Sequence, residues 1–574
     1  MKSVELYDTT LRDGAQQEGI SLSVEDKLAI TRLLDDFGVD IIEGGYAGAT
    51  PKDDEFFERV RTLDLKHAEL SAFGNTRRAD ADCDDDVSMR ALIDSGAPIT
   101  TIVGKASEYQ VRVVLETSVE ENLAMIADSV SFLKSRDRRV FYDAEHFFDG
   151  FKENSDYAVR CLRSAYDAGA ERLVLCDTNG GTLPHEIADI VNQVKDSLPD
   201  DAVLGIHTHN DTDTAVASAM EAYRAGTHQI QGCINGYGER TGNANLVSII
   251  GNLNLKMGVE AIHPEKLPEL TSLSKLVSEI VNRRPFPFQP YVGISAFTHK
   301  GGLHAAATEK SAAAYQHIDP GIVGNDTRVT ISELSGRGNV MRLIRELGLE
   351  EDLTRDDARR IVEHIKHQES LGFAYENATA SLELLILRNL PNYESPFELV
   401  DFMVIVENRR RASFGTGWRN DGVEHPVLSE ATVKIRVGED VFLEAAEGNG
   451  PVDALNRGLR KAISDKFPEV DSVNLTDYKV RVVNETMGTG ASVRVSIESA
   501  AEGQVWTTVG ASTNIINASW MALADSTEWW LNRKLRGSVP KATKRADDGD
   551  GSAKDRVATI SRSGWAASTV RSRR

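Results

Sequence analysis

Two histidines one residue apart form the first candidate site for chemistry. His207 and His209 lie in the short apolar run 203–210 (VLGIHTHN), whose pattern is that of a β-strand. Residues i and i+2 of a strand project from the same face, so both imidazoles are expected to point the same way. Imidazoles are common ligands of divalent cations, whereas a single buried histidine is usually structural. The spacing therefore favours a metal site over a structural role.

Two further segments offer oxygen ligands. Arg12 and Asp13 follow the apolar run 4–10, and a glycine-rich loop with three asparagines spans 235–246 (NGYGERTGNANL). Taken alone, the first is an ordinary surface ion pair or an anion clamp beside a metal ligand, and the second is a flexible loop or the source of an amide oxygen. An Asp/His/His/Asn set of mixed oxygen and nitrogen ligands suits Mg²⁺, Mn²⁺ or Zn²⁺, with positions left open for substrate.

These residues must be positioned by the elements around them. Eight short apolar runs alternate with amphipathic stretches, several of which end in a glycine typical of helix C-caps. The apolar runs are 4–10, 41–46, 67–73, 99–104, 139–145, 172–178, 203–210 and 228–235. Eight strand–helix units in about 250 residues predict an α/β fold of the (β/α)₈ type, a TIM barrel, with a doubly wound open sheet as the alternative. A barrel carries its functional residues at the C-terminal ends of its strands, where the candidates lie.

Changes in pattern divide the chain into four expected segments. The barrel is predicted over 1–261, followed by a helical linker subdomain over 262–395. An α+β domain is predicted over 396–534, because a β-β-β-α pattern occurs there twice. The last segment, 535–574, is rich in small and charged residues without hydrophobic period and is expected to be a disordered tail.

Composition narrows the class of protein. The chain has 574 residues, a formal net charge of −23 and 41 % hydrophobic residues. Such an acidic chain is not expected to bind nucleic acid, which requires a basic face. The chain has no apolar run long enough for a membrane helix, no signal-peptide core, and four cysteines without a C-x-x-C motif. We therefore expect a reduced, cytoplasmic protein with no membrane partner.

Separated motifs identify a family that the chain resembles. They are LYDTTLRDGAQQEGISLSVEDKLAI, HTHNDT, GYGERTGNANL, AFTHKGGLHAAA and AYQHIDPGIVGN. Together they resemble the acyl-CoA condensing branch of the metal-dependent barrel lyases, which holds the 2-isopropylmalate, homocitrate and citramalate synthases. The segments GAQQEGISLSVEDK, IIEGGYAGATPKDDEFF and YDAEHFFDGFK are most similar to the citramalate synthases of this branch. The doubled β-β-β-α unit resembles the C-terminal allosteric domain of the same family.

The resemblance implies a role for each candidate residue. The metal ligands it implies are Asp13, His207, His209 and Asn243. The residues it implies for binding and orienting the 2-oxoacid are Arg12, Thr178, Glu43 and Glu239. For the acetyl-CoA chemistry it implies Glu145 as a carboxylate of the machinery and His304 as the base, with Tyr315 nearby. His299 is the alternative base.

The family's reaction would join acetyl-CoA to pyruvate in a Claisen-type condensation, followed by thioester hydrolysis, with a divalent metal ion as cofactor. The doubled domain would then sense a branched-chain amino acid, isoleucine or leucine, or serve only for dimerisation, and a homodimer is expected. Open alternatives are another 2-oxoacid, a C–C lyase of the same barrel type, the carboxyltransferase part of a biotin enzyme, and a non-catalytic amino-acid sensor. A non-catalytic sensor is disfavoured because the chain retains the full set of Arg12, Asp13, His207, His209 and Asn243.

Overall fold

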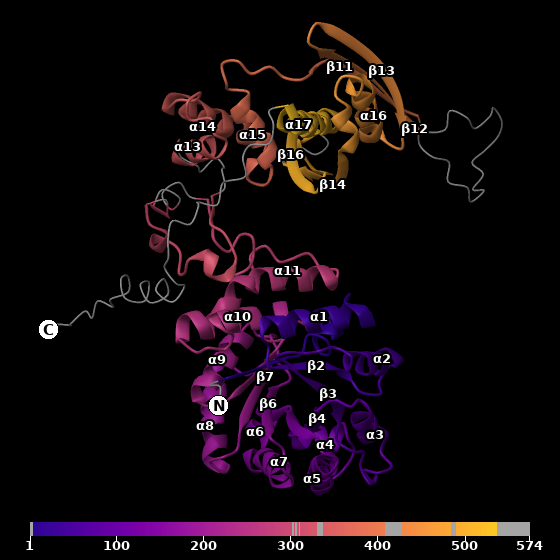
Figure 1. Cartoon of the computed structure of the whole chain (residues 1–574), viewed down its shortest axis with the longest axis vertical. Helices are drawn as coiled ribbons and strands as arrows, with labels where there is room; N and C mark the ends of the chain where they lie inside the picture. Colours follow the sequence, from indigo (N-terminus) through magenta and orange to yellow (C-terminus); the bar gives the residue numbers. More distant parts are fainter. Residues whose placement is uncertain are drawn as a thin grey trace, which may run out of the picture. The chain divides into compact units, whose positions relative to one another are not determined.

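The computed structural model describes residues 4–300, 304, 307–308, 310–329, 337–407, 428–483 and 490–535. The chain forms two compact units, Met1–His299 with Ala307–Val329, and Lys300–Ala306 with Thr330–Arg574 (Figure 1). The predicted linker segment 262–395 is thus divided between them. Of the predicted tail, all but Leu535 lies outside the described residues. Among the described residues, no helix has the length and apolar character needed to cross a membrane.

The first unit is built on a closed barrel of eight parallel strands, which confirms the (β/α)₈ prediction and excludes the open sheet. The strands are β1 Glu5–Asp8, β2 Ile41–Tyr46, β3 Glu69–Asn75, β4 Ile99–Lys105, β5 Arg139–Glu145, β6 Arg172–Asp177, β7 Leu204–Thr208 and β8 Gln229–Gly232. The barrel closes where β1 pairs with β8, with Leu6 opposite Ile230. Because all strands are parallel, their C-terminal ends form one rim, and the residues that follow them meet there.

Helices surround the barrel on its outside (Figure 1). They are α1 Val24–Phe37, α2 Pro51–Val60, α3 Val87–Asp94, α4 Glu108–Val113, α5 Val119–Ser135, α6 Phe147–Glu153, α7 Ser155–Ala168, α8 Pro184–Ser197, α9 Ala215–Ala225 and α10 Leu246–Asn252. Helix α1 begins at a capping box in which Ser23 and Asp26 satisfy each other's backbone N–H groups. It ends at Gly38, whose φ of 100° is the left-handed conformation that glycine adopts without strain.

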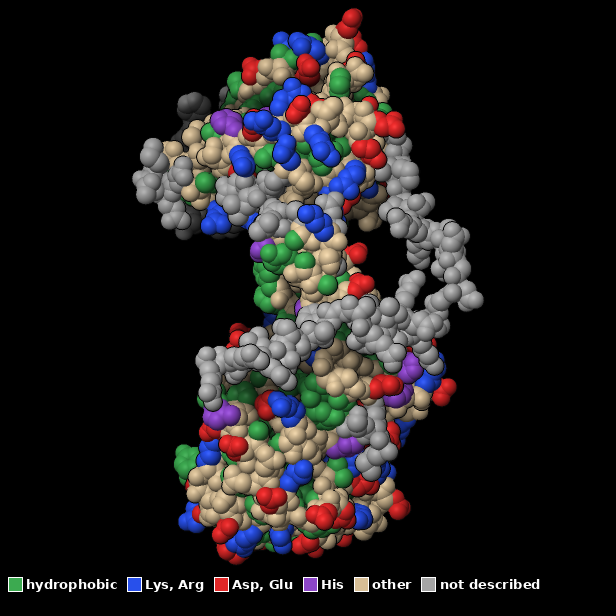
Figure 2. Space-filling view, turned by 90° about the vertical axis from the view of Figure 1, so that its left-hand side faces the viewer, with side chains coloured by type: hydrophobic (Ala, Val, Ile, Leu, Met, Phe, Trp, Pro, Cys, Tyr) green, Lys and Arg blue, Asp and Glu red, His purple; other side chains and the backbone are tan. Residues whose placement is uncertain are grey.

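Apolar packing fills two layers of the barrel. A large core between strands and helices includes the fully buried rings of Phe56, Phe147 and Phe148. Inside the barrel, a smaller cluster consists of Tyr7, Ile41, Ile99 and Phe141. The other side chains that face the barrel interior are largely polar. Because polar side chains are unusual in a buried space, they indicate a functional site near the C-terminal ends of the strands. Acidic and basic side chains are interspersed on the barrel face that Figure 2 shows.

Further elements complete the first unit beyond the barrel. Helix α11 spans Leu270–Ile280, and the two-residue strands β9 Thr298–His299 and β10 Arg328–Val329 pair in parallel. Short turns of helix are η1 Gly14–Gln16, η2 Ile234–Gly236, η3 Leu253–Met257, η4 Pro264–Glu269, η5 Ala312–Ala314 and η6 Pro320–Val323.

The second unit contains the predicted doubled β-β-β-α pattern. Its first half is β11 Glu398–Glu407, β12 Leu428–Val437, β13 Asp440–Gly448 and α16 Pro451–Ile463, and its second half is β14 Asn474–Val482, β15 Val493–Ala501, β16 Gln504–Ser512 and α17 Ile515–Leu535. Each half forms an antiparallel three-stranded sheet. The two halves share one apolar core, in which Val433 and Val495 of the central strands and Leu459 of α16 are fully buried.

In the described part of the second unit, three helices precede the doubled pattern. They are α13 Arg337–Glu346, α14 Arg355–Ser370 and α15 Thr379–Leu387, with the short turns η7 Tyr375–Asn377 and, later in the chain, η8 Pro468–Ser472. Helix α15 packs against α17, and the guanidinium of Arg388 pairs there with Asp525 at 2.8 Å and with Glu528 at 2.7 Å.

Candidate active site

Three of the four predicted metal ligands converge at the C-terminal rim of the barrel. Asp13 follows β1, His207 lies in β7, and His209 follows it. The Nε2 atom of His207 lies 3.3 Å from Oδ2 of Asp13 and 3.2 Å from Nε2 of His209, while His209 Nε2 lies 3.8 Å from the same carboxylate oxygen. All three side chains are buried, and they form a group that could hold a metal ion. The period-two prediction for the histidine pair is confirmed by this geometry.

The fourth predicted ligand, Asn243, lies beside the same group. It forms an isolated β-bridge with His209, and its Nδ2 donates to the carbonyl of Tyr237 at 3.2 Å. Its Oδ1 is buried and has no hydrogen-bond partner among the described residues. Gly238, at φ 150°, permits this approach, because a Cβ there would lie 2.3 Å from Asn243 Nδ2. A buried amide oxygen without a donor fits the role of a cation ligand.

The electrostatics of the group favour a positive charge at its centre. Burial opposes ionisation of Asp13, but Arg12 and the imidazoles outweigh it and hold the pKa of this carboxyl well below its usual range. Burial also disfavours a charged His207, yet contact with Asp13 raises the pKa of that imidazole. Burial and the neighbouring His207 lower the pKa of His209 to about 3, so His209 is neutral and offers a lone pair. A divalent cation satisfies all three groups at once.

The spacing of the ligand atoms also fits an ion. Neighbouring ligands of an octahedral ion with bonds of roughly 2.1 Å lie about 3 Å apart. The separations of 3.2 Å between the two imidazole nitrogens and 3.3 Å between His207 and Asp13 are close to this value. Two imidazoles, a carboxylate and an amide oxygen suit Mg²⁺, Mn²⁺ or Zn²⁺. The residues present therefore fit the predicted cofactor.

Arg12 is held rigidly next to this group. Its Nε donates to Oε2 of Glu43 at 2.7 Å, its Nη1 lies 3.2 Å from Asp13 Oδ2, and its Cζ lies 3.9 Å from the centroid of the Phe73 ring. Glu43 is fully buried in β2 and accepts a second hydrogen bond, at 2.9 Å, from the hydroxyl of Tyr7. Glu43 therefore positions Arg12 and leaves the rest of the guanidinium for an anion. Its role in binding or orienting the 2-oxoacid stays a prediction.

A cavity of about 730 Å³ opens beside the metal group. Its lining includes the predicted residues Arg12, Asp13, Glu145, Thr178, His207, His209 and Glu239. The hydroxyl oxygen of Thr178 accepts a hydrogen bond from the backbone N–H of His146 at 2.8 Å. The exposed Glu239 lies next to Arg240, which pairs with Asp211 at 2.8 Å and donates to the carbonyl of Thr178 at 2.8 Å. These contacts tie the loop after β8 to the rim at β6.

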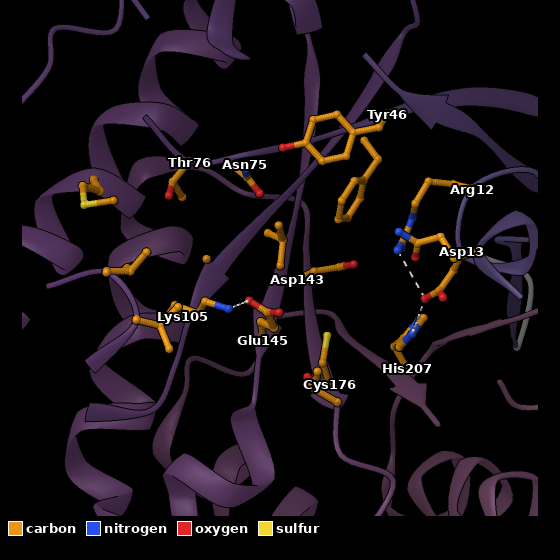
Figure 3. Close-up of a pocket in the computed structure, with 18 of the residues that line it drawn as sticks. Arg12, Asp13, Tyr46, Asn75, Thr76, Lys105, Asp143, Glu145, Cys176 and His207 are labelled. Carbon is orange, nitrogen blue, oxygen red and sulfur yellow. Dashed lines mark ion pairs between the residues drawn. The ribbon is translucent and has the colours of Figure 1, made fainter. Parts of the chain in front are cut away.

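Charged residues that the sequence reasoning missed also line the cavity, and two of them, Lys105 and Asp143, lie on strands of the barrel. Lys105, the last residue of β4, is paired in register with Glu145, the last residue of β5, and their side chains form a short ion pair (Figure 3). Asp143, two residues before Glu145, is buried, and burial raises its pKa to about 7. The rules that found the histidines would have found both, since Lys105 ends a barrel strand and Asp143 shares a strand face with Glu145.

The residues predicted for proton transfer lie elsewhere in the chain. His304 is an exposed residue of the second unit. Tyr315 belongs to the first unit and is 45 % exposed, and its ring meets the ring of His299 edge-on at 6.4 Å. Neither Tyr315 nor His299 is among the described residues that line the cavity. The assignment of a base to His304 or His299 stays a prediction.

Comparisons with known proteins match most of the chain. Residues 3–277 match the HMGL-like family model, residues 291–371 the homocitrate synthase post-HMGL domain-like model, and residues 376–531 the LeuA allosteric (dimerisation) domain. The (R)-citramalate synthase of Aquifex aeolicus is 47 % identical over 92 % of this chain and 97 % of its own. That of Geobacter sulfurreducens is 46 % identical over 94 % of this chain and 100 % of its own. The 2-isopropylmalate synthase of Methanocaldococcus jannaschii is 30 % identical over 91 % of this chain and 93 % of its own.

The order of the matched domains agrees with the structure, in which the barrel comes first and the doubled β-β-β-α unit comes last. The motifs that suggested the condensing branch lie within these matches. With a buried Asp/His/His group at the barrel rim, the chain belongs to the (R)-citramalate synthase family.

Proposed function

We propose that the protein condenses acetyl-CoA with pyruvate to (R)-citramalate and releases CoA, as a step in isoleucine biosynthesis. The observation that carries this proposal is the buried Asp13/His207/His209 group beside Arg12, in a chain 46–47 % identical over more than nine-tenths of its length to proteins named (R)-citramalate synthase. The four buried free cysteines fit a reducing compartment, and we place the enzyme in the cytoplasm.

The oxoacid would bind at the rim between the metal group and Arg12. A divalent cation held by Asp13, His207, His209 and Asn243 would act as a Lewis acid on the keto group. Arg12, fixed by Glu43, presents its free N–H groups to the oxygens of the oxoacid. When the keto carbon is attacked, negative charge develops on its oxygen, and the guanidinium stabilises it without reorganising. Thr178, whose hydroxyl is held at the cavity wall, would bind the carboxylate.

The acetyl-CoA chemistry would take place at the opposite wall of the cavity. Strands β4 and β5, which carry Lys105 and Glu145, lie across the barrel from β1 and β8 in the strand order. A base must remove a proton from the methyl group of acetyl-CoA, and His304 with Tyr315 remains the proposal for this step. Glu145, paired with Lys105, faces the cavity where the thioester would lie. Water then hydrolyses the thioester of the condensation product and releases CoA.

Pyruvate is favoured over larger oxoacids by the comparisons. The identity to the named citramalate synthases exceeds that to the 2-isopropylmalate synthase of Methanocaldococcus jannaschii, which is 30 %. The test is a thiol-release assay with acetyl-CoA and pyruvate, 2-oxoisovalerate or 2-oxoglutarate, followed by chiral chromatography of the product. We expect pyruvate to give the largest kcat/KM and (R)-citramalate as product. Absence of CoA release with pyruvate would refute the proposal.

The second unit is proposed to form a homodimer and to bind a branched-chain amino acid, isoleucine or leucine. Its match to the LeuA allosteric (dimerisation) domain supports this assignment. Apolar side chains on the outer strands, among them Met403 of β11 and Leu443 of β13, are 55 % and 65 % exposed in the single chain. Burial of such side chains against a second copy would be favourable. Because thioester hydrolysis makes the reaction effectively irreversible, inhibition at this step would control the flux.

A further inference from the structure

A line of half-buried and buried polar side chains crosses the barrel interior from its N-terminal rim to the metal group. At the rim, Arg172 at the start of β6 forms a forked ion pair with Glu5 of β1, with contacts of 3.0 and 3.1 Å. Nε2 of Gln229, at the start of β8, donates to Oε2 of Glu5 at 2.7 Å. Glu5 and Gln229 are far apart in the sequence. They meet because the barrel closes where β1 pairs with β8.

The next member of the line is Gln231, two residues along the same strand and therefore on the same face. Gln229 and Gln231 are both fully buried. Nε2 of Gln231 lies 3.2 Å from Oε1 of Gln229 and 3.2 Å from Oδ1 of Asp143. Oε1 of Gln231 lies 3.0 Å from Nδ1 of His207. The line thus connects the Arg172–Glu5 pair to a predicted metal ligand.

The ion pair determines the orientation of each amide along the line. Glu5 is paired with Arg172 and accepts hydrogen bonds, so the amide nitrogen of Gln229 faces it and the amide oxygen faces Gln231. That oxygen accepts as well, so Gln231 must turn its own nitrogen towards it. The oxygen of Gln231 then faces His207. Flipping either amide would set oxygen against oxygen, which is unfavourable in a buried site.

The tautomer of His207 follows from this orientation. An amide oxygen at Nδ1 only accepts, so Nδ1 must carry the proton. A neutral imidazole has one N–H, so the lone pair lies on Nε2, the atom that faces Asp13 and His209. We propose that Gln231 is a positioning residue of the metal centre, which fixes His207 in the tautomer that can bind a cation, and that Gln229 and the Arg172–Glu5 pair fix Gln231. The inference rests on the metal centre of the proposed function.

A second line of polar contacts offers a matched control. Ser71 Oγ lies 2.9 Å from Thr101 Oγ1, and Thr101 Oγ1 lies 2.7 Å from the hydroxyl of Tyr7, which donates to Glu43. This line leads to Arg12, and within the described residues none of Ser71, Thr101 and Tyr7 hydrogen-bonds to Gln231. Ser71→Ala therefore removes a fully buried polar group from the same barrel interior and leaves the line to His207 intact.

The test measures Mn²⁺ binding by the full-length protein, with free Mn²⁺ counted by electron paramagnetic resonance. Gln231→Met keeps the side-chain length and removes the acceptor at His207, so we expect Mn²⁺ affinity to fall about 10- to 100-fold. Gln229→Met leaves Gln231 in contact with Asp143 and should cause a smaller loss. Ser71→Ala should bind Mn²⁺ as the wild type does. Thermal unfolding and near-UV circular dichroism establish that each variant is folded.

A spectroscopic readout separates positioning from general structural damage. The ¹⁵N spectrum of the histidine-labelled, metal-free protein reports which nitrogen of His207 carries the proton, with the signal assigned from the His207→Asn variant. The wild type and Ser71→Ala should show protonated Nδ1, and this fraction should fall in Gln231→Met.

The outcomes distinguish a failure of the metal centre from a failure of the role proposed for Gln231. If the wild type binds Mn²⁺ and folded Gln231→Met binds it within twofold with the tautomer unchanged, the role of Gln231 is refuted while the metal centre stands. If the wild type binds no Mn²⁺, both the centre and the line to it are refuted. If Gln231→Met does not fold, Gln229→Met decides, because unchanged affinity there refutes control of Gln231 by the rim ion pair. Citramalate formation is measured in a separate assay, so the proposed activity is tested independently of Mn²⁺ binding.

Discussion

Replacing Arg12 by lysine tests the role of the guanidinium group in the chemistry of the site. Nε of the guanidinium donates to Glu43, Nη1 lies near Asp13, and Cζ lies over the ring of Phe73. This arrangement needs a planar fork with several N–H groups in fixed directions. A lysine keeps the positive charge but offers one compact ammonium group. It can pair with Glu43 or contact the oxoacid, and it cannot do both.

The expected changes in kcat and in stability follow from the contacts that each substitution removes in the transition state and in the folded protein. Loss of one positioned donor to a developing oxyanion lowers kcat by about 10²–10³, or about 2.7–4 kcal/mol in the barrier. Stability should change little in Arg12→Lys, because the fully buried Glu43 keeps a cationic partner. Arg12→Met would instead leave that carboxylate unpaired, at a cost of about 3–5 kcal/mol. The two substitutions therefore separate catalysis from stability.

The assay is thiol release with pyruvate and acetyl-CoA, analysed for kcat and KM, together with thermal unfolding of each variant. Arg139→Lys is the matched control, because Arg139 also pairs with two carboxylates, those of Glu69 and Glu171, and it begins β5 at the opposite rim. We expect its kcat within twofold of wild type. A kcat for Arg12→Lys within threefold of wild type would refute the role of the guanidinium.

Further expectations concern the metal, the missed ion pair, regulation and pH. His207→Ala should abolish metal-dependent turnover without unfolding the barrel, and full activity in metal-depleted buffer would contradict this. Lys105→Met should lower kcat at least tenfold by leaving Glu145 unpaired, and Lys105→Arg should restore most of it; equal rates in all three proteins would exclude a role for the pair. Deleting residues 396–574 should remove inhibition by isoleucine or leucine more than it lowers turnover, with oligomeric state measured alongside; unchanged inhibition would count against a sensor. Burial raises the pKa of Asp8 to about 7, so the folded state holds a proton that the unfolded state releases near pH 4. Stability should therefore fall as pH rises from about 4 to about 7, by on the order of 4 kcal/mol, and urea unfolding of Asp8→Asn should lack this part of the slope.

The sequence alone was sufficient for the barrel and for the core of its metal site. Alternation of apolar runs with amphipathic stretches predicts eight strand–helix units, and the H-x-H spacing places His207 and His209 on one face. Both are consequences of local backbone geometry, the period of two in strands and of 3.6 in helices. The rule that functional residues follow barrel strands then adds Asp13, and the family resemblance singles out Asn243 in the loop after the eighth strand. The structure brings both to the histidines.

Only the tertiary structure determined which side chains support these residues. The contact of Glu5 with Gln229 joins residues 224 positions apart and exists because β1 closes the barrel on β8. The pairing of Lys105 with Glu145 depends on the register between β4 and β5. Register follows from the tilt and shear of the closed barrel, a property of all eight strands together, so no single segment encodes it. Sequence thus identifies the groups that could bind the metal, and barrel closure decides which buried partners orient them.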